Sequence, residues 1–98
     1  VIYEKAIKDF DKSISLAPDF SFAYYNRAFA KSKLKDLNGA VKDIESAIKT
    51  TPDFAEAYFN KGLLLIYLKN NTEGCQSLSR AGELGMKEAY STIKKLCN

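Results

Sequence analysis

A three-residue segment, Pro18-Asp19-Phe20, recurs 34 positions later as Pro52-Asp53-Phe54. The segments that follow are also alike, since residues 21–28 read SFAYYNRA and residues 55–62 read AEAYFNKG. A repeat of this period is typical of stacked supersecondary units, each of which buries its apolar face against the next. We therefore expect a repeat array, and stacked repeats of this kind present an extended surface that can bind a partner.

Apolar residues recur at three- and four-residue steps along most of the chain, which is the pattern of amphipathic helices. Pro18 and Pro52 interrupt this pattern, Asp19 is the predicted N-cap of the second helix, and Gly85 is a predicted C-terminal cap. No segment alternates with a period of two, so we predict no strands and an all-α fold. The predicted helices cover residues 1–16, 21–34, 37–49, 55–68, 72–84 and 87–96.

The composition argues against most enzymatic functions. The chain has 98 residues, no histidine and five dispersed glycines, so it carries neither a His-based catalytic or metal site nor a glycine-rich phosphate loop. We expect no catalytic residue, no cofactor and no metal. A net charge of +3 is too small and too scattered to indicate nucleic acid. The longest apolar run, residues 63–68, is far below the roughly 18 residues of a membrane span.

The two cysteines, Cys75 and Cys97, form no metal-binding or redox motif. We predict that Cys75 is a small buried apolar residue and that Cys97, close to the C-terminus, is exposed. A disulfide would require the last helix to fold back onto the preceding one, and we expect none. The pair is compatible with a reducing compartment, so the sequence leaves the location open and slightly favours the cytoplasm.

The repeat resembles the tetratricopeptide repeat family over nearly the whole chain. That family keeps small residues where its helices approach closely, because helices about 8–10 Å apart need small side chains at the contact. The corresponding positions here are all Ala, Gly or Ser. They are Ala6, Ser13, Ala28, Ala40, Ala47, Gly62, Gly74 and Ala81. The bulky positions of the family are also filled, by Tyr24, Tyr58, Phe10, Ile44 and Leu78.

The resemblance implies one domain over residues 1–98, built as a right-handed superhelix of antiparallel helix hairpins. Residues 1–20 resemble the second helix of a partial repeat, 21–54 a full repeat and 55–88 a full but irregular one that lacks the closing proline. Residues 87–98 resemble a capping helix whose Ala89, Tyr90, Ile93 and Leu96 would pack inward. Because the first helix lacks a preceding partner, we interpret the chain as the C-terminal part of a longer array. A second copy covering that face is the alternative.

In this family the first helix of each repeat lines the concave side. The lining residues implied here are Phe22, Tyr25, Asn26, Phe29 and Lys33, and then Glu56, Phe59, Asn60, Leu63 and Tyr67. Helical spacing agrees, since each set forms a stripe at three- and four-residue steps. Aromatic side chains supply contact area, and Asn can pair with a peptide backbone as both donor and acceptor. We predict a non-enzymatic scaffold that binds a peptide or helix of another protein.

Alternatives remain at this point. The same aromatic residues could be core, or could bury against a second copy in a homo-oligomer. Some family members grip a C-terminal carboxylate with Asn and basic residues. Asn26 and Asn60 fit that pattern, but Glu56 would repel a carboxylate. RNA recognition would need a basic groove, and Glu56, Phe59 and Leu63 argue against one.

Overall fold

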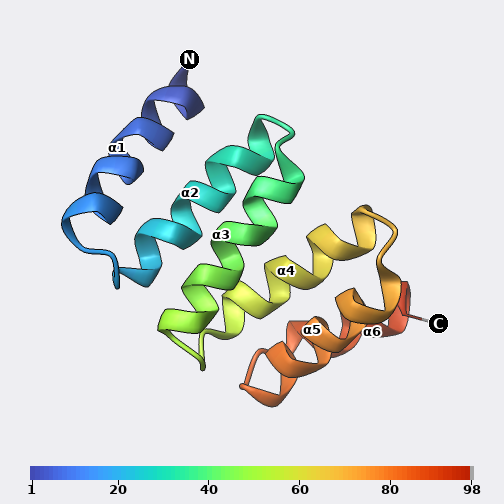
Figure 1. The fold of residues 1–98 in the computed structure, drawn as a ribbon. Helices are drawn as coiled ribbons and strands as arrows, with labels where there is room; N and C mark the ends of the chain where they lie inside the picture. The colour runs from blue at the N-terminus through green and yellow to red at the C-terminus, as the bar shows by residue number, and fades with distance from the viewer. Residues whose placement is uncertain (98) are drawn as a thin grey trace. The chain divides into compact units, whose positions relative to one another are not determined.

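The computed structural model describes residues 1–97, which form six α-helices joined by short turns and contain no strand (Figure 1). The all-α helical-repeat fold is therefore confirmed, and each helix lies within one or two residues of its predicted bounds. No helix in the described part of the chain is long and apolar enough to cross a membrane. The helices are α1 Ile2–Leu16, α2 Ser21–Lys33, α3 Leu37–Thr50, α4 Ala55–Tyr67, α5 Asn71–Glu83 and α6 Glu88–Leu96.

The chain forms two compact units, and the first, Val1–Pro52, contains α1, α2 and α3. Helix α2 packs against both of its neighbours, with α3 running antiparallel to it after a short turn (Figure 1). The buried side chains are small, and small side chains let helices pack closely. They are mainly Ala23, Ala28 and Ala30 from α2 and Ala40, Ile44 and Ala47 from α3. Helix α1 contributes no fully buried residue to this unit.

The second unit, Asp53–Asn98, contains α4, α5 and α6, and here α5 packs against both α4 and α6. Its core again combines small residues with a few large ones. The buried apolar residues of its helices are Ala57, Leu65, Leu78, Ala81 and Ala89. Leu78 is fully buried and lies where a side chain on Gly62 would have to go. The tight crossing of α4 and α5 therefore depends on the absence of a side chain at Gly62.

The predicted small positions occupy close contacts as expected, with two exceptions. Six of the eight are buried: Ala28, Ala40, Ala47, Gly62, Gly74 and Ala81. Ala6 and Ser13, both on α1, are only half-buried.

Three helices end in the same hydrogen-bonding pattern, known as the Schellman motif. After α5, the Gly85 N–H donates to the Gly82 carbonyl and the Met86 N–H donates to the Ala81 carbonyl, both at 3.0 Å. Gly85 has φ 105°, so the predicted glycine cap is confirmed. Helices α2 and α4 end in the same way, but with Lys35 and Lys69 in the left-handed position, at φ 68° and 70°.

The predicted N-cap of the second helix is wrong. Phe20, not Asp19, occupies the N-cap position of α2, and no side chain accepts a hydrogen bond there. A side-chain cap is found instead at α3, where the Asp36 carboxylate accepts a hydrogen bond from the Gly39 N–H at 3.0 Å. Asp19 lies one residue too early in the chain, within the turn, to cap α2.

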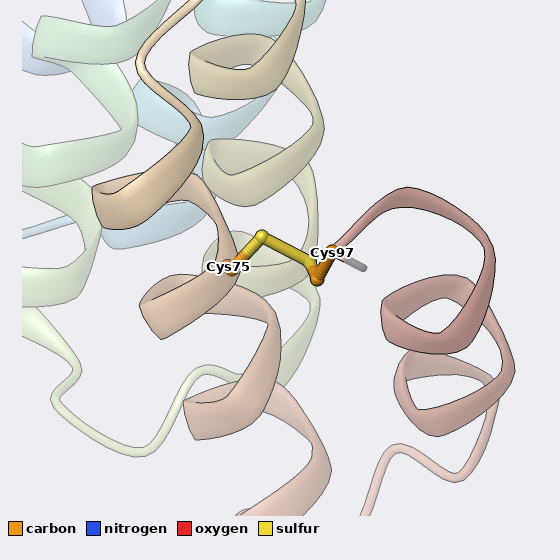
Figure 2. Close-up of a disulfide and its surroundings, with 2 residues drawn as sticks. All are labelled: Cys75 and Cys97. Atoms are coloured by element: carbon orange, nitrogen blue, oxygen red, sulfur yellow. A yellow bond between two sulfur atoms is a disulfide. The ribbon is translucent and has the colours of Figure 1, made fainter.

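Two expectations about the C-terminal part are also wrong. Cys75 and Cys97 form a disulfide, which requires α6 to fold back onto α5, and both residues are half-buried (Figure 2). Inward packing of α6 is confirmed for Ala89, and Ile93 is half-buried, whereas Leu96 is exposed and Tyr90 is exposed although its ring lies against Gly82. Helix α6 is only nine residues long and packs against α5 alone, so its apolar face is broader than the surface it can cover.

Candidate functional site

The predicted binding residues of α2 lie on its solvent-facing side. Phe22 and Phe29 are 56% and 57% exposed, although each is a large apolar side chain in a unit that buries its alanines. Asn26 and Lys33 are exposed too, and Tyr25 is half-buried. None of the five is part of the core, because the core-facing positions of α2 are taken by Ala23, Ala28 and Ala30.

Two aromatic residues that sequence reasoning did not select extend this surface. Tyr3 of α1 meets Phe29 edge-on, with ring centroids 6.4 Å apart, and Phe20 meets Phe22 in the same geometry at 6.4 Å. We call Tyr3, Phe20, Phe22, Tyr25 and Phe29 the α2 aromatic surface. Phe20 belongs to the repeated Pro-Asp-Phe segment but is not among the residues predicted to bind a partner. Its repeat counterpart, Phe54, is buried.

The cations of α2 are divided between its two sides. Arg27 binds the buried Asp43 of α3 through two hydrogen bonds, from Nε to Oδ2 at 2.8 Å and from Nη2 to Oδ1 at 2.7 Å. The same guanidinium reaches α1, where Nη1 donates to Asp11 Oδ1 at 2.8 Å. Lys31 Nζ lies 3.0 Å from Asp43 Oδ2. This network joins all three helices of the first unit.

Arg27 is the member of this network whose pKa is shifted. The hydrogen bonds to Asp43 raise the pKa of Arg27 above its usual value despite partial burial, so this group is always charged. Sequence reasoning missed the network, although Asp43 gave a signal. It stands three residues after Ala40 and four before Ala47, on the packed face of α3. A carboxylate there needs a cation.

Lys33 is the α2 cation that remains outside the network. Its ammonium lies 5.3 Å from the centroid of the Phe29 ring, a cation–π distance, and it forms no ion pair with any of residues 1–97. Helix α2 contains no acidic residue. The α2 aromatic surface therefore ends in a positive charge that is exposed to solvent.

The predicted residues of α4 are less exposed than those of α2. Glu56 is exposed at the start of the helix and Tyr67 is 70% exposed at its end. Phe59, Asn60 and Leu63, between them, are half-buried. Like the α2 set, none of these side chains is fully buried, so α4 presents a mixed polar and apolar stripe.

The chemistry available at these stripes is non-covalent. Among residues 1–97, no group of three His, Cys, Asp or Glu side chains is placed to hold a metal ion. What the two helices offer is aromatic area, amide side chains and single charges of opposite sign at Lys33 and Glu56.

A comparison with known families decides the classification. The profile of the tetratricopeptide repeat matches residues 3–20, 23–54 and 55–84, which is most of the chain. The chain belongs to the tetratricopeptide repeat family. Proteins of this family are typically non-enzymatic interaction modules, and the matched segments cover α1, the pair α2–α3 and the pair α4–α5.

Solved tetratricopeptide structures share the fold over nearly the whole chain. The first such domain of Spaghetti (RPAP3), bound to the HSP90 peptide SRMEEVD, superposes with a TM-score of 0.90 at 26% identity, covering 97% of this chain and 77% of that one. The TPR2B domain of yeast Sti1, in a pHsp70 complex, gives 0.82 at 27% identity, covering 95% and 74%. MamA gives 0.88 at 20% identity, covering 93% and 54%.

A curated relative matches a shorter piece of this tetratricopeptide protein. Protein FlbA of Caulobacter vibrioides is 58% identical over 31 residues, which is 32% of this chain and 5% of FlbA. The match therefore spans only a small part of that protein's length.

Proposed function

We propose that this chain binds a peptide segment or a helix of a partner protein along the solvent-facing side of α2, and that the stripe on α4 offers a second surface of the same kind. The observation that carries this proposal is the exposure of Phe22 and Phe29 by more than half on a helix that otherwise buries alanines. Exposed apolar patches of this kind mark interaction sites. The Spaghetti (RPAP3) domain bound to an HSP90 peptide and the yeast Sti1 domain in its pHsp70 complex, which share the fold, support it further.

Each group on the surface has a separate role in the proposal. The α2 aromatic surface supplies apolar contact area, as aromatic anchors do in many interfaces. On α4, that contribution comes from Phe59, Leu63 and Tyr67. Asn26 is exposed and can donate to a peptide carbonyl while accepting from a peptide N–H. Asn60 is the repeat counterpart of Asn26 on α4.

Charge sets the preferred ligand sequence in this proposal. Arg27 and Lys31 form ion pairs with Asp43. Lys33 is therefore the α2 cation that can pair with an acidic side chain of a ligand. Glu56 on α4 favours a basic or polar side chain and disfavours a terminal carboxylate nearby. The ligand expected on α2 is therefore a segment with an apolar residue next to Asp or Glu.

The test is a selection from a displayed library of random peptides. Enriched peptides are synthesised, and their affinities are measured by fluorescence anisotropy for the wild type, for Phe22→Ser/Phe29→Ser and for Leu16→Ser. Leu16 is the matched control, because it is an exposed apolar residue (78%) on α1 outside the α2 aromatic surface. Circular dichroism confirms that all three proteins are folded.

We expect the double substitution to weaken binding at least about tenfold, equivalent to about 1.4 kcal/mol, and Leu16→Ser to leave it unchanged. The proposal is wrong if no peptide is enriched over a display without the domain, or if both variants bind as tightly as the wild type. Loss of acidic residues from the peptides selected on Lys33→Glu would support the charge assignment, and unchanged peptides would contradict it.

Self-association is a second candidate function, and one observation favours it. Helix α1 buries none of its residues fully, and Leu16 is among its exposed apolar side chains. A second copy could cover this face. A dimer that persists in a dilution series measured by light scattering, and that Leu16→Asp converts to monomer, would establish this function. A monomer at all concentrations would exclude it.

A further inference from the structure

The disulfide joins the last helix to the one before it. Cys75 lies in the second turn of α5 and Cys97 directly follows α6, and their Cα atoms are 5.9 Å apart (Figure 2). The bond closes a loop across 22 positions of sequence. These are the only two cysteines of the chain, so the pairing within the chain has no competitor. The cross-link fastens the C-terminal end of α6.

The packing of α6 is uneven, and the disulfide lies where the packing is weakest. In its first turn Ala89 is fully buried, and the ring of Tyr90 lies against Gly82 of α5. In its last turn Leu96 is 44% exposed, and Lys94 and Lys95 face solvent. A nine-residue helix is shorter than the roughly 12–15 residues that an isolated helix needs. Helix α6 therefore depends on its contacts with α5, and the disulfide to Cys75 supplies the contact at its C-terminal end.

We infer that Cys75 and Cys97 are an oxidation site closed by a thiol–disulfide exchange partner, and that this chain works in an oxidising compartment. One thiolate attacks a disulfide of the partner and releases one of the partner's sulfurs as a thiol, leaving a mixed disulfide. The second thiolate of this chain then attacks the chain's own sulfur in the mixed disulfide and displaces the partner's remaining sulfur. The chain thereby loses two electrons and two protons, and the partner leaves as a dithiol. Such bonds persist outside the reducing cytosol. This inference replaces the slight preference of the sequence for the cytoplasm, and it is independent of peptide binding.

The first experiment measures the thiol state of the protein in its own cells. Cells of the source organism are quenched in acid, and free thiols are labelled with a maleimide that adds a large mass before any reduction. We expect no label on the chain without prior reduction and two labels after it. Labelled cysteines in the unreduced sample would overturn the inference.

The second experiment measures what the bond does for α6. The oxidised chain is compared with the reduced chain and with Cys75→Ala/Cys97→Ala by thermal unfolding and by amide hydrogen exchange. Because closing a loop of this size constrains the unfolded chain, we expect the unfolding midpoint to fall by at least about 10 °C on reduction. We expect exchange to become faster in the last turn of α6, while the double variant behaves like the reduced wild type and is insensitive to reductant.

The result that would overturn a structural role is an unfolding midpoint and an α6 exchange pattern that are the same with and without reductant. The double variant guards against a side effect of the reducing agent. If the unfolding midpoint of the double variant equals that of the oxidised wild type instead of that of the reduced wild type, the bond does not hold α6.

Discussion

Gly62 in α4 and Gly74 in α5 bring the backbones of their two helices into contact. A Cβ atom on Gly62 would lie 2.8 Å from the Gly74 carbonyl oxygen and 2.7 Å from Leu78 Cγ, and a Cβ on Gly74 would lie 2.9 Å from the Gly62 carbonyl oxygen. These separations are shorter than ordinary van der Waals contacts, and one partner is backbone that cannot rotate away. The pair explains why two residues that weaken isolated helices stand inside α4 and α5.

The substitution Gly62→Ala should therefore destabilise the chain. Alanine gains about 1 kcal/mol of helix propensity over glycine, but overpacking against a fixed carbonyl and a buried Leu78 costs about 1–3 kcal/mol. We expect a net loss of about 1–2 kcal/mol in the free energy of unfolding, measured by urea denaturation. Ser79→Ala, at an exposed position of α5, is the control and should change stability little. A more stable Gly62→Ala variant would show that α4 and α5 can move apart freely.

Gly82→Ala should have the opposite outcome, although its contact distances are similar. The nearest atoms to a Cβ on Gly82 are Cζ and Cε1 of Tyr90, at 2.8 and 2.9 Å. They are the far end of a side chain that is more than half exposed, so the ring can swing into solvent. We expect stability to stay equal or to rise by up to about 1 kcal/mol, from helix propensity. A clear loss in urea denaturation would mean that the ring is held in place, and the same change in a Tyr90→Ala background should then become stabilising.

The fold followed from the sequence because its determinants are periodic. The 34-residue repeat and the small residues at Ala28, Ala40 and Gly62 can be read from spacing alone, since each depends on one helix face meeting another. The candidate binding stripe of α2 was predictable for the same reason. The small residues of α2 mark the faces that pack against neighbouring helices, so the remaining side chains of α2 are those that face solvent.

The features that were missed depend on which particular side chains meet. The binding of Arg27 to Asp43 joins residues 16 positions apart on different helices, and no helical period relates them. The disulfide has no motif spacing, so Cys75 and Cys97 gave no signal before α6 was seen to fold back onto α5. The position of Tyr3 beside Phe29 likewise depends on how α1 crosses α2, which the pattern of neither helix specifies.

Removal of the buried carboxylate should be the most damaging single polar change. Asp43→Asn leaves Arg27 and Lys31 without their shared anion, and breaking a buried pair in this way costs about 3–5 kcal/mol. The control is Asp11→Asn, which removes the 55% exposed partner of the same guanidinium and should cost less than about 1 kcal/mol. Urea denaturation of both variants would test this order. Equal effects would mean that the network acts as a surface ion pair.

The helix ends should respond to glycine according to their backbone angles. Lys69 follows α4 at φ 70°, where a side chain costs about 1–2 kcal/mol, while glycine adds roughly 0.5–1 kcal/mol of chain entropy to the unfolded state. Lys69→Gly should therefore raise the free energy of unfolding by about 0.5–1 kcal/mol, and Lys35→Gly after α2 should do the same.

Gly85→Ala is the reverse substitution, which places a side chain at a helix end that now has glycine. A Cβ at Gly85 meets nothing within 4 Å, so any loss there reports the strained φ of 105° alone and should be about 1 kcal/mol. A neutral Gly85→Ala together with a stabilising Lys69→Gly would contradict this account. The gain in stability at Lys69 would then come from removing its charge and not from relief of backbone strain, and Lys69→Gln would reproduce it.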